Sequence, residues 1–509
     1  MGTQPSRLGA SVLANFAGSA WGVLISIAFV PVYLHYLGAE GYGVVGFSTT
    51  LFSIVAFLDG GLTLTINREF ARLSDSTANA PQMRDMLSAG TVLFGALAVL
   101  IVAALWAAAP FIAQSWLNAD RISVAELTTS LRLVGFVLGE QMIWALLQGA
   151  LFGLHRQVIA NVVLGGGLAV RAVGAMLILR YWSATPSAFF AWYGVIFLLQ
   201  ISIGWVLVGR YIGARRTFTV PRADKVKALL HQTKGFGAIA LLSLLLGNVD
   251  KLLVSRLLPL KDFGYYMVAV SVGLVPLLIS GPVTSAFFPR LARLAKSSPR
   301  EALDIFRTGT LVVASIVIPV GFSIAMFSHE VIFAWTGSGE ISAHVAPIVS
   351  VLIAGYTINA SLQMSYYYEM AYARTRILMY VNIVAVSILI PSMVVMSRIY
   401  GAVGVAECWL LLNIGILFVS LPIVLRPGLK GELGRYYTES LLPPYFVALP
   451  IIGVARLLIP SGLPRIFGGA VAVAAGAVAL AACFVVIPSL RRMIVERGKY
   501  LYASFAPDM

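Results

Sequence analysis

The amino-acid sequence predicts an all-α polytopic membrane protein with about fourteen transmembrane helices in two homologous lobes. Of its 509 residues, 59% are hydrophobic and only 11% are charged, whereas soluble domains carry about 25% charged residues. Apolar segments of the roughly 20 residues that a spanning helix requires recur along the whole chain. One early stretch also returns in the second half at a constant shift.

The apolar segments begin close to the amino terminus. We expect helices near residues 8–34, 41–70, 84–113, 124–153, 157–181, 187–211, 231–257, 262–290, 302–328, 343–373, 376–398, 402–425, 438–459 and 464–489. The first segment is too long for a signal peptide and lacks a convincing cleavage site, so we expect it to remain as a helix.

The repeat relates residues 36–73 to residues 257–294. A shift of 221 residues superposes four pairs along this stretch: Leu37 on Leu258, Gly43 on Gly264, Gly60 on Gly281 and Arg72 on Arg293. Because the opening turn and the charged end match at one shift, we infer two homologous halves. Membrane transporters are often built from such repeats, with the substrate path between them. The pattern therefore indicates a two-lobed carrier.

The basic residues predict the orientation of the chain. Most Lys and Arg residues lie in the terminal segments and in the even-numbered loops, whereas the odd-numbered loops hold few. Basic loops stay in the cytoplasm, so we expect both termini to be cytoplasmic. The net charge of +15 follows from this topology, and we expect no nucleic-acid partner. The most basic loop, from Arg210 to Lys234, is expected to be a linker lying on anionic lipid.

Three cations lie inside apolar segments: Arg132, Arg171 and Lys251. An unpaired cation in hydrocarbon is costly, so each should face protein or water. Together they could form a positive wall, because guanidinium groups bind phosphate oxygens through paired hydrogen bonds. We therefore expect these three residues to bind an anionic substrate or to be neutralised by internal acids.

The internal acids that could neutralise them are Asp59, Glu140 and Asp250. Asp59 begins a polar face of the second segment, where Thr63 and Asn67 follow at steps of four. An acid within the membrane is also the natural acceptor of a coupling cation. These three residues are our candidates for ion coupling.

The tenth segment carries polar side chains on two faces of one helix. One face holds the candidate substrate-binding residues Asn359, Gln363, Tyr366 and Tyr367, and Glu369 lies on another. A helix that is polar on two faces is surrounded by protein or water rather than lipid. The tyrosines could stack on sugar rings or pack as an aromatic core.

Sequence motifs of soluble catalysis are missing. The chain has no GxxxxGK[ST] loop for nucleotide hydrolysis, and no HExxH or paired CxxC for a metal. Its two cysteines, Cys408 and Cys483, lie in apolar segments and are expected to pack in the core. We therefore expect a transporter rather than an enzyme, with no cofactor or metal, driven by a substrate or ion gradient.

Three motifs carry a family resemblance: YLGAEGYGVVGF, FLDGGL followed by REFARL, and GYYMVAVSVGLVPLLISGPVTSAFFPRLARL. They resemble the polysaccharide-export flippases, the Wzx-type O-antigen and exopolysaccharide translocases of the multidrug/oligosaccharidyl-lipid/polysaccharide superfamily. The motifs cover the second and eighth segments, whereas the fourteen-span layout covers the whole chain.

The resemblance implies a MATE-like, V-shaped pair of six-helix lobes at residues 1–220 and 221–430. Residues 431–509 would hold two peripheral helices and a cytoplasmic tail. It further implies alternating access in the bacterial inner membrane, turning an undecaprenyl-diphosphate-linked oligosaccharide from the cytoplasmic to the periplasmic leaflet. A proton or sodium would be the coupling ion, and a polymerase and a chain-length regulator are expected partners.

Three alternatives remain open at this point. A lipid II flippase would share the architecture. A cation-coupled multidrug exporter should prefer an acidic cavity, which Arg132, Arg171 and Lys251 argue against. A membrane-embedded glycosyltransferase or polymerase should have large periplasmic loops, whereas the odd-numbered loops are short and poor in charge.

Overall fold

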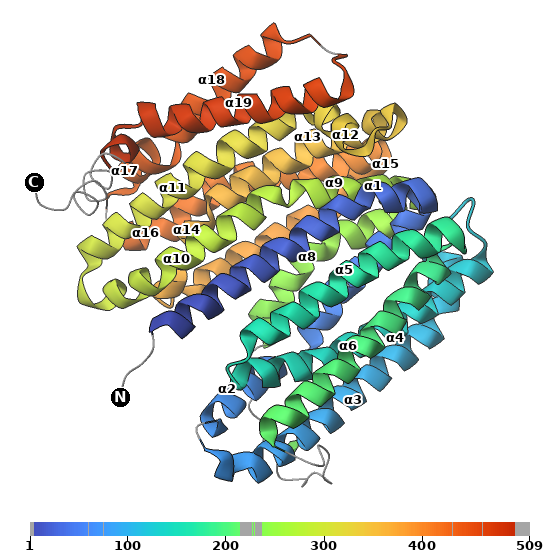
Figure 1. Cartoon of the computed structure of the whole chain (residues 1–509). Coiled ribbons are helices and arrows are strands. Elements are labelled where there is room, and N and C mark those ends of the chain that lie inside the picture. Colours follow the sequence, from blue (N-terminus) through green and yellow to red (C-terminus); the bar gives the residue numbers. More distant parts are fainter. Residues whose placement is uncertain are drawn as a thin grey trace, which may run out of the picture. The chain divides into compact units, whose positions relative to one another are not determined.

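The computed structural model describes residues 5–59, 61–74, 76–213, 226–227, 229, 237–429, 431–460 and 462–493. These ranges are almost entirely helical (Figure 1). The chain divides into two compact units, Met1–Met267 and Val268–Met509. Most of the predicted basic loop from Arg210 to Lys234 lies outside the described residues. The predicted lobe boundary near residue 220 stays a prediction.

The first unit contains long helices that run side by side. Its elements are α1 (Pro5–Leu58), α2 (Leu62–Leu73), η1 (Thr77–Asn79), α3 (Ala80–Phe111), η2 (Ile112–Trp116), α4 (Val124–Gly153), α5 (Gln157–Tyr181), α6 (Pro186–Ile212) and α8 (Gly237–Leu257). Helix α9 (Leu260–Gly273) begins in this unit. Helix α5 packs against α1 and α6, and α4 packs against α2, α3 and α6 (Figure 1).

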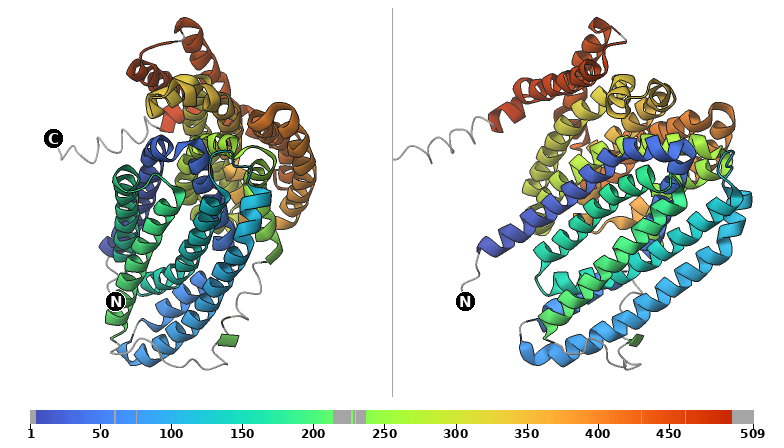
Figure 2. Two further views of the ribbon diagram at one scale, coloured as in Figure 1. Left: turned by 90° about the vertical axis from the view of Figure 1, so that its right-hand side faces the viewer. Right: turned by 45° about the vertical axis from the view of Figure 1, so that its right-hand side comes forward.

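The second unit is built around α11. Its elements are α10 (Val275–Ser297), α11 (Pro299–Met326), α12 (Ser328–Thr336), α13 (Gly339–Ser361), α14 (Gln363–Ala371), α15 (Thr375–Gly415), η3 (Ile416–Ser420), α16 (Leu421–Leu429), α17 (Leu433–Tyr436), η4 (Tyr437–Leu441), α18 (Pro443–Leu458) and α19 (Arg465–Val486). Helix α11 packs against α10, α13, α18 and α19. Figure 2 shows α18 and α19 as a red pair at one edge of this unit.

Glycines mark the points where long helices change direction. Gly38 has φ 70° and ψ 178° within α1, and Gly401 has φ 62° and ψ −139° within α15. A positive φ is readily adopted only by glycine. Both positions agree with the predicted breaks between segments 8–34 and 41–70 and between 376–398 and 402–425.

The described residues include 11 helices that are long and apolar enough to span a membrane. Two of these spans, Trp21–Phe57 and Arg376–Arg426, contain the breaks at Gly38 and Gly401. The all-helical polytopic fold is therefore confirmed, while the number of fourteen spans remains a prediction. One element was not expected from the sequence, the short helix α12.

A connecting segment after η2, residues 116–122, ties the first unit together; we call it the strap. The carboxylate of Glu40 accepts hydrogen bonds from the backbone N–H groups of Asp120, Arg121 and Ile122, at 2.9–3.2 Å. On the other side, the Leu260 N–H donates to the carbonyl oxygen of Asn118 at 2.8 Å. These bonds explain why the first unit extends beyond α8 into α9.

The last two helices are bound closely to the second unit. Buried Glu330 on α12 pairs with Arg456 on α18, with 2.6 Å between the carboxylate and the guanidinium group. The Ser323 hydroxyl of α11 donates to the carbonyl oxygen of Ala472 on α19. Gly476 of α19 lies against Ser323, where an added Cβ would be 3.2 Å from the serine Cβ. Small residues thus allow α19 to lie directly on α11.

Helices α5 and α6 also approach each other at glycines. A Cβ at Gly174 would collide with the indole of Trp192, whereas a Cβ at Gly166 would meet no atom within 4 Å. We expect Gly174→Ala to lower the stability of the protein by about 1–3 kcal/mol, because the indole must move within a packed interface. Gly166→Ala is the matched control on the same helix and should be neutral or stabilising, since alanine favours helix over glycine. Thermal unfolding of the two purified variants would check this, and equal melting temperatures would contradict it.

Candidate functional site

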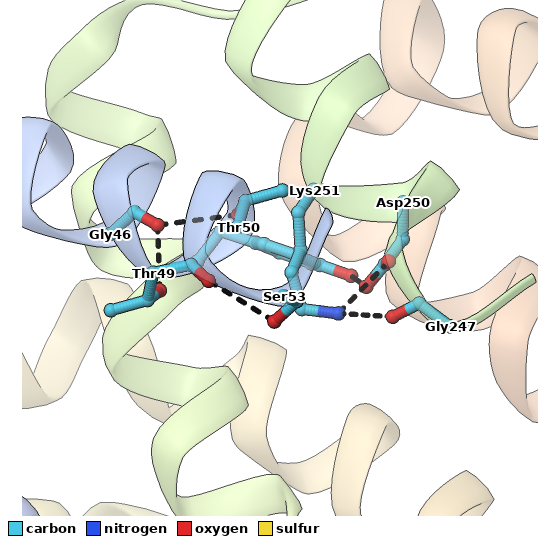
Figure 3. Close-up of polar contacts among 8 residues, drawn as sticks. Gly46, Thr49, Thr50, Ser53, Gly247, Asp250 and Lys251 are labelled. Atoms are coloured by element: carbon cyan, nitrogen blue, oxygen red, sulfur yellow. Dashed lines mark hydrogen bonds and ion pairs between the residues drawn. The ribbon is translucent and has the colours of Figure 1, made fainter. Parts of the chain in front are cut away.

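Lys251 and Asp250 form a buried ion pair on α8. The Lys251 Nζ lies 3.3 Å from Asp250 Oδ1 and donates to the carbonyl oxygen of Gly247 at 2.6 Å (Figure 3). The second carboxylate oxygen, Asp250 Oδ2, accepts a hydrogen bond from the Tyr266 hydroxyl at 2.8 Å. Both side chains of the pair are at least 90% buried. Internal neutralisation, one of the two alternatives from the sequence, is therefore the arrangement that the structure has for Lys251.

Helix α1 presents three hydroxyl groups in the same region, on Thr49, Thr50 and Ser53 (Figure 3). The Thr49 and Thr50 hydroxyls donate to the carbonyl oxygen of Gly46, at 2.7 and 3.2 Å. The Ser53 hydroxyl donates to the carbonyl oxygen of Thr49 at 3.1 Å. Each hydroxyl is thus satisfied by its own helix, as is common for Ser and Thr within helices.

Arg171 lies in an aromatic cage between α5 and α6. Its guanidinium carbon is 3.9 Å from the ring centroid of Phe197 and 5.7 Å from that of Tyr193. The Tyr193 hydroxyl is in turn 3.3 Å from the hydroxyl of Tyr33 on α1. Arg171 is only 4% exposed. Among the described residues, its Nε and Nη1 atoms have no hydrogen-bond partner, so two strong donors remain available inside the unit.

Glu140 of α4 is the acid that belongs to this site. It interacts electrostatically with Arg171, and a Cβ added at Gly194 on α6 would lie 3.7 Å from its Oε2 atom. In the described part of the chain, that oxygen also lacks a hydrogen-bond partner. Unpaired donors and acceptors at one buried place are usually bridged by water or a ligand. Helices α4, α5 and α6 therefore enclose a polar site within an apolar bundle.

Arg132 lies elsewhere on α4. Its side chain is exposed, with the guanidinium carbon 5.5 Å from the ring centroid of Trp106 on α3. The Trp106 indole N–H donates to the Arg132 carbonyl oxygen at 3.2 Å. Arg132, Arg171 and Lys251 thus have three different sets of neighbours, and the structure does not bring them together in one cluster.

The second segment is not the continuous helix that the sequence predicted. Helix α1 ends at Leu58 and α2 begins at Leu62, with Gly61 at φ 82° between them. Asp59 lies at this break, where its Oδ1 atom accepts hydrogen bonds from the N–H and hydroxyl of Thr63, at 3.1 and 2.9 Å. Asp59 therefore caps the start of α2, because the side chain satisfies a backbone donor that the new helix leaves free.

The tenth segment is likewise broken, at Leu362 between α13 and α14. The polar residues do not continue along one face across this break. The Asn359 amide donates to Asn413 Oδ1 on α15 at 2.8 Å. Gln363 Oε1 accepts from the hydroxyls of Ser280 and Thr284 on α10, at 2.9 and 3.0 Å. Both amides are thus engaged within the second unit.

The tyrosines of α14 have different environments. Tyr366 is 51% exposed, and its ring centroid lies 5.9 Å from that of Tyr367. The Tyr367 ring in turn lies 5.2 Å from the ring of Phe288 on α10. These three rings form an exposed aromatic surface, which can stack on the apolar face of a sugar.

Sequence reasoning missed the partners of Arg171. The aromatic residues Phe189, Tyr193 and Phe197 recur at steps of four, which places them on one face of α6. That spacing was the available signal, but only the packing of α5 on α6 turns this face toward Arg171. Glu369 was noted only in passing, yet it is fully buried, and neither of its carboxylate oxygens has a hydrogen-bond partner among the described residues. No group of three potential metal ligands occurs in the described ranges.

The buried ion pair makes a stability prediction. We expect Lys251→Met to destabilise the protein by about 3–5 kcal/mol, because Asp250 would be left as a buried charge without a counter-ion. The double variant Asp250→Asn/Lys251→Met should recover most of this loss, since it removes both charges. Thermal unfolding of the single and double variants is the measurement. An additive double variant would show that the two side chains are not coupled.

Comparison with known proteins identifies the family. Residues 8–295, more than half of the chain, match the family described as "Polysaccharide biosynthesis protein". The chain is 26% identical over 212 residues to the Escherichia coli (strain K12) "Lipopolysaccharide biosynthesis protein WzxC", an alignment that covers 42% of each protein. It is 23% identical over 407 residues to the Shigella flexneri "Putative O-antigen transporter", covering 78% of this chain and 92% of that protein.

Two solved structures share the fold. The structure described as "Lipid II flippase MurJ, inward closed conformation" has a TM-score of 0.68 at 14% identity, covering 95% of this chain and 99% of that one. An inward-facing multidrug resistance MATE family transporter of the MOP superfamily has a TM-score of 0.61 at 15% identity, covering 82% and 96%. These likenesses confirm the MATE-like fold. With the family match over residues 8–295, they establish that this membrane protein belongs to the polysaccharide biosynthesis protein family.

Proposed function

We propose that this protein is a transporter that moves a lipid-linked oligosaccharide across the bacterial inner membrane. The observation that carries the proposal is the buried guanidinium of Arg171, with two free donors inside a membrane-spanning bundle. Such donors suit the oxygens of an undecaprenyl diphosphate. Family membership and the names of the two curated relatives support a polysaccharide precursor as the substrate.

The three cations contribute unequally to substrate binding in this proposal. Arg171 is the principal phosphate ligand, because its donors have no competing partner in the described residues. Arg132 is exposed and can meet a phosphate early in transport. Lys251 is neutralised by Asp250, so it attracts an anion only if that pair separates.

The glycan is placed on the aromatic surface of Tyr366, Tyr367 and Phe288. Tyr366 is half-exposed, so its ring can stack on a sugar. Asn359 and Gln363 are bound to Asn413, Ser280 and Thr284, and their role in this proposal is to orient the helices on which the aromatic surface lies.

Glu140 is the coupling acid in this proposal, ahead of Asp59 and Asp250. Asp59 is held as a helix cap, and Asp250 is paired with Lys251 and Tyr266. Glu140 keeps an unpaired buried oxygen beside Arg171. A proton fits this place better than sodium, because the adjacent guanidinium repels a second cation. Protonation of Glu140 would release Arg171 for the substrate phosphate, which couples the two movements.

Substitution of Arg171 tests this proposal. We expect Arg171→Met to lower substrate affinity roughly ten- to a hundred-fold, because a charge-assisted hydrogen bond contributes about 1.5–3 kcal/mol. Arg171→Lys should restore affinity only in part, since an ammonium group lacks the guanidinium fork. The measurement is flipping of an undecaprenyl-diphosphate oligosaccharide in proteoliposomes, together with membrane abundance. Arg180→Ala, at the end of the same helix, is the control and should flip normally.

A purely structural role for Arg171 would give another result. In that case Arg171→Met would lower membrane abundance, and Arg171→Met/Glu140→Gln would restore it by removing the unpaired acid. Full flipping by Arg171→Met at normal abundance would refute the phosphate site. Full flipping of lipid II with none of the oligosaccharide lipid would favour a peptidoglycan substrate instead.

The proposed topology has both termini in the cytoplasm. Asp120 and Ala343 lie in or next to odd-numbered loops, and Ala78 and Ser297 in or next to even-numbered loops; all four are exposed. Cysteines at Asp120 and Ala343 should therefore react with an impermeant thiol reagent in intact spheroplasts, whereas cysteines at Ala78 and Ser297 should react only after permeabilisation. The reverse pattern would show that the orientation is wrong. Glu40 is unsuitable as a label site because it is buried under the strap.

A further inference from the structure

The two copies of the internal repeat touch each other at their opening turns, within the first unit. A Cβ added at Gly43 would lie 2.7 Å from the carbonyl oxygen of Leu260. A Cβ added at Gly264 would collide with the carbonyl oxygen of Ala39. The shift of 221 residues carries Gly43 to Gly264 and Ala39 to Leu260. The two contacts are therefore reciprocal, which is the mark of a local two-fold axis.

A third contact locates this axis. The same shift carries Gly46 to Met267, and a Cβ at Gly46 would lie 2.8 Å from the Cβ of Met267. A residue touches its own symmetry equivalent only close to the axis. Helices α1 and α9 thus cross on the local axis, with backbone directly against backbone.

The atoms that meet at this crossing are backbone and apolar side-chain atoms. The hydrogens of Gly43 and Gly264 that a Cβ would replace point toward carbonyl oxygens, an arrangement typical of weak Cα–H···O contacts between helices. Such a crossing can separate without leaving a buried charge unpaired. A side chain larger than hydrogen at either glycine would hold the two helices apart.

The strap reinforces the crossing. It is held to the first copy by Glu40, through charge-assisted bonds to three backbone N–H groups. It is held to the second copy and α8 by neutral bonds, from Leu260 to Asn118 and from Trp116 Nε1 to Ser255 Oγ at 3.1 Å. Charge-assisted bonds are roughly twice as strong as neutral ones. When the copies separate, the strap therefore stays with α1.

We propose that the crossing of α1 and α9 at Gly43 and Gly264 is the gate that closes the outer end of the transport path. This inference rests on the proposed transport function. The crossing adjoins the strap, which lies on the predicted periplasmic side, so release of substrate to the outer leaflet requires the two opening turns to part. The reciprocal contacts make the gate symmetric, and each copy of the repeat supplies one glycine and one carbonyl oxygen.

A disulfide across the axis tests the gate. In a chain with Cys408→Ala and Cys483→Ala, the pair Gly46→Cys/Met267→Cys places two Cβ atoms 2.8 Å apart, so a shift of about 1 Å reaches disulfide geometry. Fluorophores on genetically encoded residues at Asp120 and Ala343 report the outer ends by single-molecule energy transfer in nanodiscs. We expect two exchanging distances in the reduced protein, one after oxidation, and exchange again after reduction. Continued exchange in the oxidised protein would overturn the gate.

A second pair of variants keeps the test decisive if the disulfide protein does not fold. Gly264→Ala should shift the population toward the open state by at least about fivefold, because overpacking of a close contact is unfavourable. Gly281→Ala is the matched control, since its added Cβ meets no atom within 4 Å. Identical distance distributions for both variants would contradict the gate. If the disulfide stops the exchange but no oligosaccharide lipid crosses in proteoliposomes, the gate stands and the proposed substrate fails.

Discussion

A charge inside the membrane must be neutralised or shielded, and this constraint shapes the first unit. The chain meets it in two ways. Lys251 is neutralised by the acid next to it, with Tyr266 completing the set of bonds. Arg171 is shielded by aromatic rings and an acid on another helix, but keeps free donors. The first arrangement is complete and stabilises the fold, whereas the second is incomplete and therefore suits reversible binding.

The helical architecture could be predicted from the sequence because two strong signals determine it. Apolar length sets the spans, and glycines with positive φ set the reversals at Gly38 and Gly401. The breaks at Asp59–Gly61 and at Leu362 were not predicted. The first lies within an apolar run, where two glycines are compatible with a continuous membrane helix. The second has no glycine or proline at all, and it depends on packing among α10, α13 and α14.

The candidate site was predictable only in part. The sequence singled out Arg171 and Glu140 because both are charged within apolar segments, but their proximity depends on how α4, α5 and α6 pack. The pairing of Lys251 with Asp250 was an open alternative, because neighbouring residues on a helix normally point apart. The long lysine side chain overcomes this by folding back to the Gly247 carbonyl oxygen, which brings its ammonium group to Asp250. Arg132 was grouped with the other cations by its depth in the sequence pattern, which carries no information on its direction.

The attachment of α19 to α11 has a consequence for the gene. Ala472, Gly476 and neighbouring small residues fill the space beside α11, and Arg456 supplies the counter-charge of buried Glu330. A premature stop codon shortly after residue 430 would remove all of these groups at once. The truncated product would expose apolar helix surface and strand an acid in the membrane, so quality-control proteases should degrade it. The two terminal helices are therefore as indispensable to the cell as the conserved-looking repeat that precedes them, even though they contribute no residue to the proposed transport path.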